Sequence, residues 1–229
     1  MADARWMAIV EDLRSEGDTK QAQVLAGYLK TSSLEFFGLK IPAIAAITKR
    51  HTQGMSHLEL AELMPQLWSV PVYEARRAAI VILQSYARRG DPEIGLALVS
   101  DWLDDVDTWA LVDPMCTEGL GRLVMRSSDV ERTVAEWRNS ENFWRRRATI
   151  LPYLYMSLKR NFSEDNVPRI VDSLRPHLAD RQFFVAKAVG WVLRELSKRS
   201  PGSVRSFIAE NRAIMSPLSI REGSEKLQM

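Results

Sequence analysis

The stretch DTWALVDPMC, residues 107–116, places an indole and a carboxylate four positions apart, at Trp109 and Asp113. Residues i and i+4 lie on one face of an α-helix, so the two side chains are expected to share a patch of surface. An indole prefers burial and a carboxylate prefers water. Their pairing is therefore either an accident of a surface helix or a site.

A structural interpretation of the same residues is also open. Asp113 directly precedes Pro114, and an Asp N-cap followed by proline at the first helical position is a common helix start. A proline inside a helix would instead remove a backbone hydrogen bond and kink the axis. If the helix begins near Asp107, Trp109 and Asp113 precede that kink and keep their shared face.

Two further stretches carry cations beside aromatic residues. SENFWRRRATI, residues 140–150, has three consecutive arginines that cannot share one helix face, because successive positions are 100° apart. An apolar run follows at once, so at least one of Arg146 and Arg147 is expected to point along a buried wall. The alternative interpretation is a solvated charge run.

In FFVAKAVGWVLRELSKRSP, residues 183–201, Lys187 and Trp191 are four apart, and Arg194 lies three beyond Trp191. Gly190 costs a helix about 1 kcal/mol relative to alanine, so it indicates the close approach of another group, such as a neighbouring helix. A purely structural role for Trp191 remains an alternative.

Lys40, in SLEFFGLKIPAI, precedes a predicted helix start whose positive end could hold a phosphate, although a plain structural turn explains that stretch equally well.

The elements that position these residues are predicted to be helices throughout. Apolar residues recur at helical spacing in ARWMAIVEDLRS and KQAQVLAGYLK, and alternating strand patterns are absent. Helix-length segments are separated by breakers: SSLEFFGLKIP, ARRGDPE, NFSEDNVP and RSPGS. The predicted fold class is all-α.

Composition excludes several classes of protein. The 229 residues are 46% hydrophobic and 26% charged, with a net charge of +2 that argues neither for nor against nucleic acid. Cys116 is the single cysteine and the three histidines lack ligand spacing, so we expect neither a disulfide nor a metal or other cofactor. No apolar run is long enough for a membrane span and the N-terminal stretch does not resemble a signal peptide, so a cytoplasmic protein is expected.

Weak internal repeats refine the fold prediction. RRAAIVIL begins at Arg76 and RRATILPYL at Arg146, 70 residues later, and AKAVGWVL begins at Ala186. Helix pairs of the HEAT type repeat at about 40 residues, so the separation of 70 is interpreted as two shorter repeats. The prediction is one domain, residues 1–229, forming a right-handed solenoid of HEAT-like repeats with a concave basic groove. Its inner helices would carry these pairs: Arg76/Arg77, Trp109/Asp113, Arg146/Arg147 and Lys187/Trp191.

A groove lined by cations and indoles suits nucleic acid, because cations contact phosphates and aromatic faces press against bases and sugars. Two alternatives remain open at this point: a scaffold that binds a partner peptide, and a repeat protein that binds DNA without cutting it.

With these residues assembled, the chain resembles the AlkD-like DNA alkylation-repair glycosylases, which are built from HEAT-like repeats. The resemblance covers about residues 28–200 and is carried by five segments in family order: FFGLKIP, YEARRAAIVIL, DTWALVD, SENFWRRRATIL and FFVAKAVGWVLRELSK. It implies a monomeric, cofactor-free enzyme of base-excision repair. Its substrate would be double-stranded DNA, from which it removes cationic N3- or N7-alkylated purines without flipping the base.

The resemblance also implies roles for individual residues. The catalytic residues that the resemblance implies are Asp113, Trp109 and Arg147. Asp113 matches the catalytic aspartate, Trp109 its neighbouring tryptophan, and Arg147 an arginine that helps to hold the DNA backbone. Trp191 matches a second tryptophan that contacts the sugar, and Tyr28 a tyrosine that contacts the backbone. The remaining DNA-binding residues are expected from their positions beside these: Lys40, Arg146, Lys187 and Arg194.

The implied chemistry agrees with the residues. Loss of an already cationic base leaves an oxocarbenium-like sugar, so no general acid is needed, and a fixed carboxylate stabilises that charge and orients water. The chain departs from the family at Ala110, Leu111 and Pro114, and at residues 43–47, AIAAI, where family members tend to be basic. Residues 203–229, beyond the resemblance, are expected to form one short helix and a loose tail.

Overall fold

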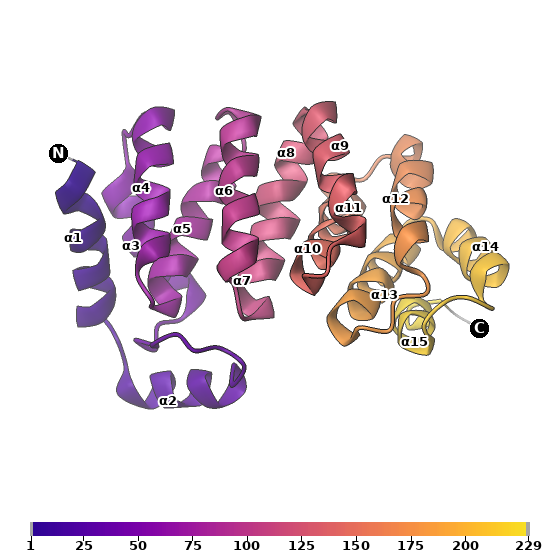
Figure 1. Cartoon of the computed structure of the whole chain (residues 1–229), viewed down its shortest axis with the longest axis horizontal. Helices are drawn as coiled ribbons and strands as arrows, with labels where there is room; N and C mark the ends of the chain where they lie inside the picture. Colours follow the sequence, from indigo (N-terminus) through magenta and orange to yellow (C-terminus); the bar gives the residue numbers. More distant parts are fainter. Residues whose placement is uncertain (1, 228–229) are drawn as a thin grey trace. The chain divides into compact units, whose positions relative to one another are not determined.

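The computed structural model describes residues 2–227, and these are helical apart from turns, loops and one isolated bridge between Glu35 and Val72. The predicted all-α class is confirmed. The chain divides into two compact units, Met1–Met115 and Cys116–Met229, and each is described by itself. Figure 1 shows the helices in chain order. Within the described residues, no helix is both long and apolar enough to cross a bilayer.

The first unit contains helices that pack in pairs against their neighbours along the chain. Helix α4 packs on α5, α4 contacts α6, and α5 contacts α7, so α4 and α6 form one layer and α5 and α7 the other. This two-layer arrangement is the one expected of HEAT-like pairs. The helices are α1 (Ala2–Ser15), α2 (Thr19–Tyr28), α3 (Ile41–Thr52), α4 (His57–Ser69), α5 (Tyr73–Tyr86), α6 (Pro92–Asp105) and α7 (Trp109–Pro114).

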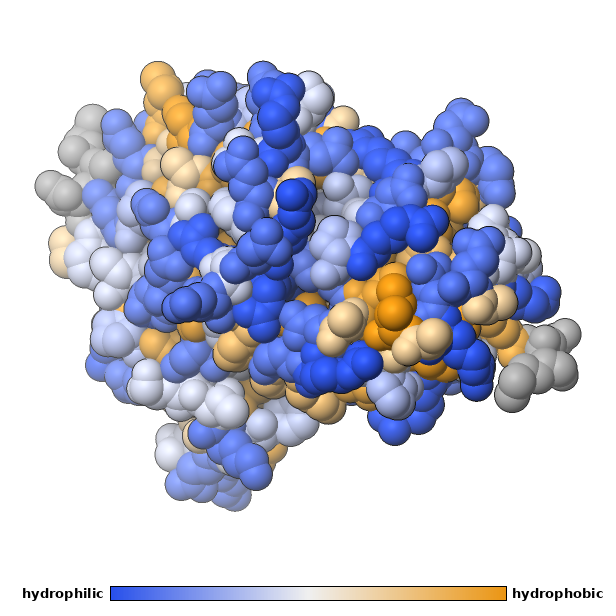
Figure 2. Space-filling view, turned by 45° about the vertical axis from the view of Figure 1, so that its right-hand side comes forward, coloured by the Kyte–Doolittle hydropathy of each residue, from blue (hydrophilic) through white to orange (hydrophobic). Residues whose placement is uncertain are grey.

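The second unit repeats this principle. Helices α8, α11, α13 and α15 contact one another in succession, while α9 packs on α8, α12 on α11, and α14 on both α13 and α15. The helices are α8 (Gly121–Arg126), α9 (Ser128–Glu136), α10 (Phe143–Ala148), α11 (Leu151–Ser157), α12 (Val167–Leu174), α13 (Phe183–Ser197), α14 (Pro201–Asn211) and α15 (Pro217–Ser224). Hydrophilic side chains cover most of the face seen in Figure 2.

Polar residues before the helices explain where many of them begin. Ser56 and Glu59 form a complete capping box at α4, and Asp91 precedes Pro92, the first residue of α6. Side chains also accept hydrogen bonds from the first turns of α2, α7, α9, α10 and α13; these caps are Asp18, Thr108, Ser127, Asn142 and Gln182.

The C-terminal segment is more ordered than the sequence indicated. Residues 203–227 contain most of α14 and all of α15, so the expectation of one short helix and a loose tail was wrong; residues 228 and 229 lie outside the described chain. Helix α15 packs closely on α13, and a Cβ on Gly190 would lie 2.5 Å from Cβ of Glu222. The close approach predicted from Gly190 is confirmed, and the approaching group is α15.

A buried histidine in the second unit gives a testable pH dependence. His177 is 1% exposed, and its Nε2 lies 2.6 Å from Oγ1 of Thr149 in a hydrogen bond. Burial lowers the pKa of His177 from 6.5 to about 4. Between these values the unfolded chain binds a proton that the folded chain does not, so stability falls as the pH falls through this range.

We expect this imidazole to cost the wild type roughly 3 kcal/mol of unfolding free energy between pH 7 and pH 4, because one pKa unit corresponds to about 1.4 kcal/mol. Urea unfolding of the wild type and of His177→Gln at both pH values measures the effect. The variant should lose less stability on acidification than the wild type does. Equal losses in the two proteins would contradict this account.

Candidate nucleic-acid interface

Helix α7 carries Trp109 and Asp113. The Thr108 side chain caps it by accepting a hydrogen bond from the backbone N–H of Ala110, at 3.3 Å. Trp109 is then the first helical residue and Asp113 lies one turn later, and both are half-buried. The two share a helix face. The alternative interpretation, in which Asp113 caps a helix that starts at Pro114, is wrong.

Pro114 changes the helix rather than ending it. Because proline has no N–H, it cannot donate to the carbonyl of Ala110, and the chain continues as a π-helical turn, Met115–Leu120. Nε2 of Gln84 in α5 donates to the carbonyl oxygen of Pro114 at 3.0 Å. Turns of this kind are frequent at functional sites. The predicted disruption thus follows Asp113 and leaves the turn between Trp109 and Asp113 intact.

Tyr28, predicted from the resemblance alone, lies against Trp109. The two rings meet edge to face, with centroids 5.8 Å apart and planes at 85°, a favourable geometry for an aromatic pair. Tyr28 is the last residue of α2 and is 68% exposed. The structure therefore brings three of the predicted residues, Tyr28, Trp109 and Asp113, together in the first unit.

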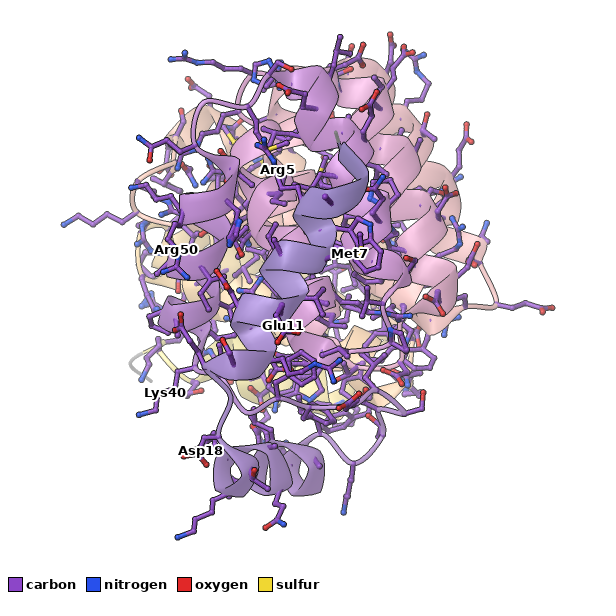
Figure 3. All side chains as sticks on the ribbon, turned by 90° about the vertical axis from the view of Figure 1, so that its left-hand side faces the viewer. Arg5, Met7, Glu11, Asp18, Lys40 and Arg50 are labelled. Atoms are coloured by element: carbon purple, nitrogen blue, oxygen red, sulfur yellow. The ribbon has the colours of Figure 1, made fainter. Side chains whose placement is uncertain are left out.

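Lys40 stands immediately before α3, at its N-cap position, and makes no side-chain cap. It is exposed, near the edge of the unit in Figure 3.

The loop that leads to Lys40 is held by a residue that sequence reasoning missed. Glu74 in α5 is fully buried and accepts hydrogen bonds from three backbone N–H groups, those of Phe37, Gly38 and Leu39, at 2.9, 2.8 and 3.2 Å.

The paired arginines of α5 do not line an open surface as the repeat argument predicted. Arg76 is 7% exposed and its guanidinium lies 2.7 Å from the carboxylate of Asp105 and 4.9 Å from the ring centroid of Trp68. Trp68 in turn stacks on Trp102. Arg77 is 9% exposed. Both cations are buried within the first unit, and the partners of Arg76 come from the neighbouring helices α4 and α6.

In the second unit, Arg146 and Arg147 also have partners within the protein. Nε of Arg146 donates to Asp180 at 2.8 Å, and NH1 donates to the carbonyls of Ser140 and Glu141. Arg147 is 3% exposed and donates to the carbonyl of Phe184 at the start of α13. The expectation that at least one arginine follows a buried wall is confirmed, and their DNA contacts stay predictions.

Helix α13 presents the remaining predicted residues. Lys187 is exposed and its ammonium lies 5.5 Å from the ring centroid of Phe183, one turn earlier. Trp191 is half-buried, another turn along the same face. Arg194 pairs with two carboxylates of the C-terminal segment, Glu222 at 3.1 Å and Glu225 at 2.7 Å, and its side chain is 26% exposed. Lys187 is thus the most accessible cation of this set.

No group of three or more His, Cys, Asp or Glu side chains that could hold a metal ion occurs among residues 2–227. The predicted residues of the first unit supply a carboxylate, an indole, a phenol and an exposed ammonium group, and those of α13 in the second unit supply an indole and an exposed ammonium group.

Comparisons with known proteins bear on the family and the fold of the chain. A family model described as DNA alkylation repair enzyme matches residues 9–227. The chain is similar in structure to a protein described as a predicted DNA alkylation repair enzyme from Enterococcus faecalis, with a TM-score of 0.76 and 23% identity over 92% of this chain and 96% of that one.

It is also similar to AlkD2 from Streptococcus mutans, with a TM-score of 0.65 and 18% identity over 90% of this chain and 99% of that one. A third similar structure is smu.31 from Streptococcus mutans UA159, with a TM-score of 0.65 and 17% identity over 91% of this chain and 100% of that one. No curated protein matches the chain significantly. At 17–23% sequence identity, the similarity of the chain to these structures shows a shared fold alone.

Proposed function

Because this chain belongs to the DNA alkylation repair enzyme family, we propose that it is a DNA glycosylase. Its substrates are cationic N3- and N7-alkylated purines in duplex DNA, and it hydrolyses their N-glycosidic bond without flipping the base. The observation that carries this proposal is the pairing of Trp109 and Asp113 on one face of α7, with Tyr28 packed against the indole.

The proposed reaction uses the charge that the damaged base already has. The bond between C1′ of the sugar and the purine nitrogen breaks, and its electron pair leaves with the base, which becomes neutral. The sugar is left as an oxocarbenium-like cation. Water then supplies the oxygen that bonds to C1′ and releases a proton to solvent.

Asp113 supports this reaction in two ways. Its fixed negative charge stabilises the cation as it forms, and its oxygens orient the attacking water. The face of Trp109 offers electron density to the same cation. A single acid suffices because the leaving base needs no proton. We therefore assign Asp113 and Trp109 as catalytic residues.

Binding of the duplex is assigned to residues of both units. In the first, Tyr28 and Lys40 are exposed; in the second, Lys187 is exposed and Trp191 and Arg194 are partly so. Phosphate attraction dominates such binding. Arg146 and Arg147 remain part of the proposal. Since both already bond within the protein, we expect Lys40 and Lys187 to provide the larger share of that attraction. We propose that the protein acts as a monomer without metal or cofactor.

Incubation of the purified protein with a methylated duplex, followed by measurement of the free bases, tests the proposal. We expect release of N7- or N3-methylpurine, together with duplex binding that weakens steeply as salt rises. Tight DNA binding without base release would favour a DNA-binding protein, and no binding at low salt would favour a peptide-binding scaffold. Either outcome would overturn the assignment as a glycosylase.

A further inference from the structure

Helix α2, which carries Tyr28, buries none of its own residues. Figure 1 shows it set apart from the other helices of the first unit. An element without a buried face is not held by packing, so the contacts at its two ends must set its position. At its start, the backbone N–H of Asp18 donates to the carbonyl of Phe37 at 2.9 Å.

At the end of α2 the attachment is made by Asp107. Its Oδ2 accepts two hydrogen bonds from Ser33, from the backbone N–H at 2.6 Å and from the hydroxyl at 3.1 Å. The main-chain carbonyl of Asp107 accepts a third, from the hydroxyl of Thr31 at 3.3 Å. Leu29, the first residue after the helix, is 3% exposed. The chain that follows Tyr28 is therefore tied directly to residue 107.

Asp107 also stands at the start of the catalytic helix. Thr108, the N-cap of α7, follows it, and Trp109 is the next residue. One residue thus bonds to the loop behind Tyr28 and lies two positions before the indole against which Tyr28 packs. A side chain in this place fixes the spacing between α2 and α7 and with it the geometry of the aromatic pair.

We infer that Asp107 is a positioning residue: it holds the loop after α2 so that Tyr28 packs edge-on against Trp109. This inference rests on the proposed function, because the aromatic pair matters only if Trp109 faces the sugar. Charge-assisted hydrogen bonds to backbone N–H groups are strong and directional, which suits a carboxylate for this role. A displacement of about 1 Å at a reacting centre can cost roughly 100-fold in rate.

A first experiment needs no DNA. Amide hydrogen exchange of residues 29–34 is compared in the wild type, Asp107→Ala and Asp107→Asn, with Asp91→Ala as matched control. Asp91 caps α6 in the same unit, where its side chain accepts hydrogen bonds from the backbone N–H groups of Glu93 and Ile94. We expect faster exchange in Asp107→Ala, partial recovery in Asp107→Asn, which keeps an acceptor oxygen, and no change in the control. Unchanged exchange in Asp107→Ala would overturn the inference.

A double-mutant cycle tests whether Asp107 acts through Tyr28. Single-turnover base release is measured for Asp107→Ala, Tyr28→Ala and the double variant at saturating enzyme. We expect each single variant to be slower by about tenfold or more, and the double variant to be no slower than Tyr28→Ala alone. Multiplying effects, or an undiminished rate in Asp107→Ala, would refute the positioning role.

The two proposals fail in different ways. A wild type that releases no base refutes the glycosylase assignment while the exchange result stands. A wild type that releases base, with exchange of residues 29–34 independent of Asp107, refutes only the positioning role.

Discussion

Asp113→Asn is expected to slow single-turnover release of 7-methylguanine by roughly 100- to 1,000-fold, the range found when one charge-stabilising group is removed from an active site. Asparagine keeps the size of the side chain and one acceptor oxygen but carries no charge. The loss therefore measures what the negative charge contributes to the developing sugar cation.

The matched control for this variant is Asp101→Asn, which removes an exposed carboxylate from α6 in the same unit. Its rate should stay within about threefold of the wild type, since surface charges contribute little. Duplex affinity of Asp113→Asn should be unchanged or slightly higher, because a negative charge repels phosphates. If Asp113→Asn retains its rate to within threefold, Asp113 is not the catalytic carboxylate.

The largest expected effect on stability concerns Glu74. Its carboxylate is fully buried and accepts hydrogen bonds from three backbone N–H groups of residues 37–39. Glu74→Ala leaves those donors buried without this partner, so the free energy of unfolding should fall by roughly 3–5 kcal/mol. Urea unfolding at pH 7 measures the change.

Two variants make this stability test specific. Glu74→Gln keeps one oxygen acceptor and should lose less than Glu74→Ala does. Glu93→Ala removes an exposed carboxylate from the first turn of α6 and should cost no more than about 1 kcal/mol. A loss below about 1 kcal/mol in Glu74→Ala would mean that the loop before Lys40 does not depend on this carboxylate.

Features set by local sequence could be predicted. Apolar spacing and breakers predict helices, and the helices are confirmed. The shared face of Trp109 and Asp113 is confirmed as well, because it needs only one helical turn, which Thr108 caps. Gly190 was informative for the same reason, since a glycine inside a helix leaves room for a close neighbour. That neighbour is α15, whose own packing the sequence did not indicate.

The roles of the charged residues could not be predicted, because they depend on partners far along the chain. Arg76 and Arg146 resemble groove cations in sequence, yet Asp105 and Asp180 hold them within their units. Glu74 lies among charges in YEARR, yet its carboxylate is buried and accepts hydrogen bonds from three backbone donors of residues 37–39. The hydrogen bonds of Asp107 to Thr31 and Ser33 have no local signature either.

Partners within the protein also decide which cations are open to a ligand. Lys40 and Lys187 are exposed, whereas Arg76, Arg77 and Arg147 are each less than a tenth exposed. Counting basic residues on the predicted inner helices therefore overstates the charge available to phosphates.

In the proposed mechanism this protein stabilises a sugar cation and protonates no leaving base. The most direct test compares single-turnover release from duplexes that differ only in the lesion: 7-methylguanine, which is cationic, and hypoxanthine, which is neutral. We predict release of 7-methylguanine and no measurable release of hypoxanthine. Comparable rates for the two bases would show that the enzyme supplies a general acid, and would contradict the mechanism assigned to Asp113.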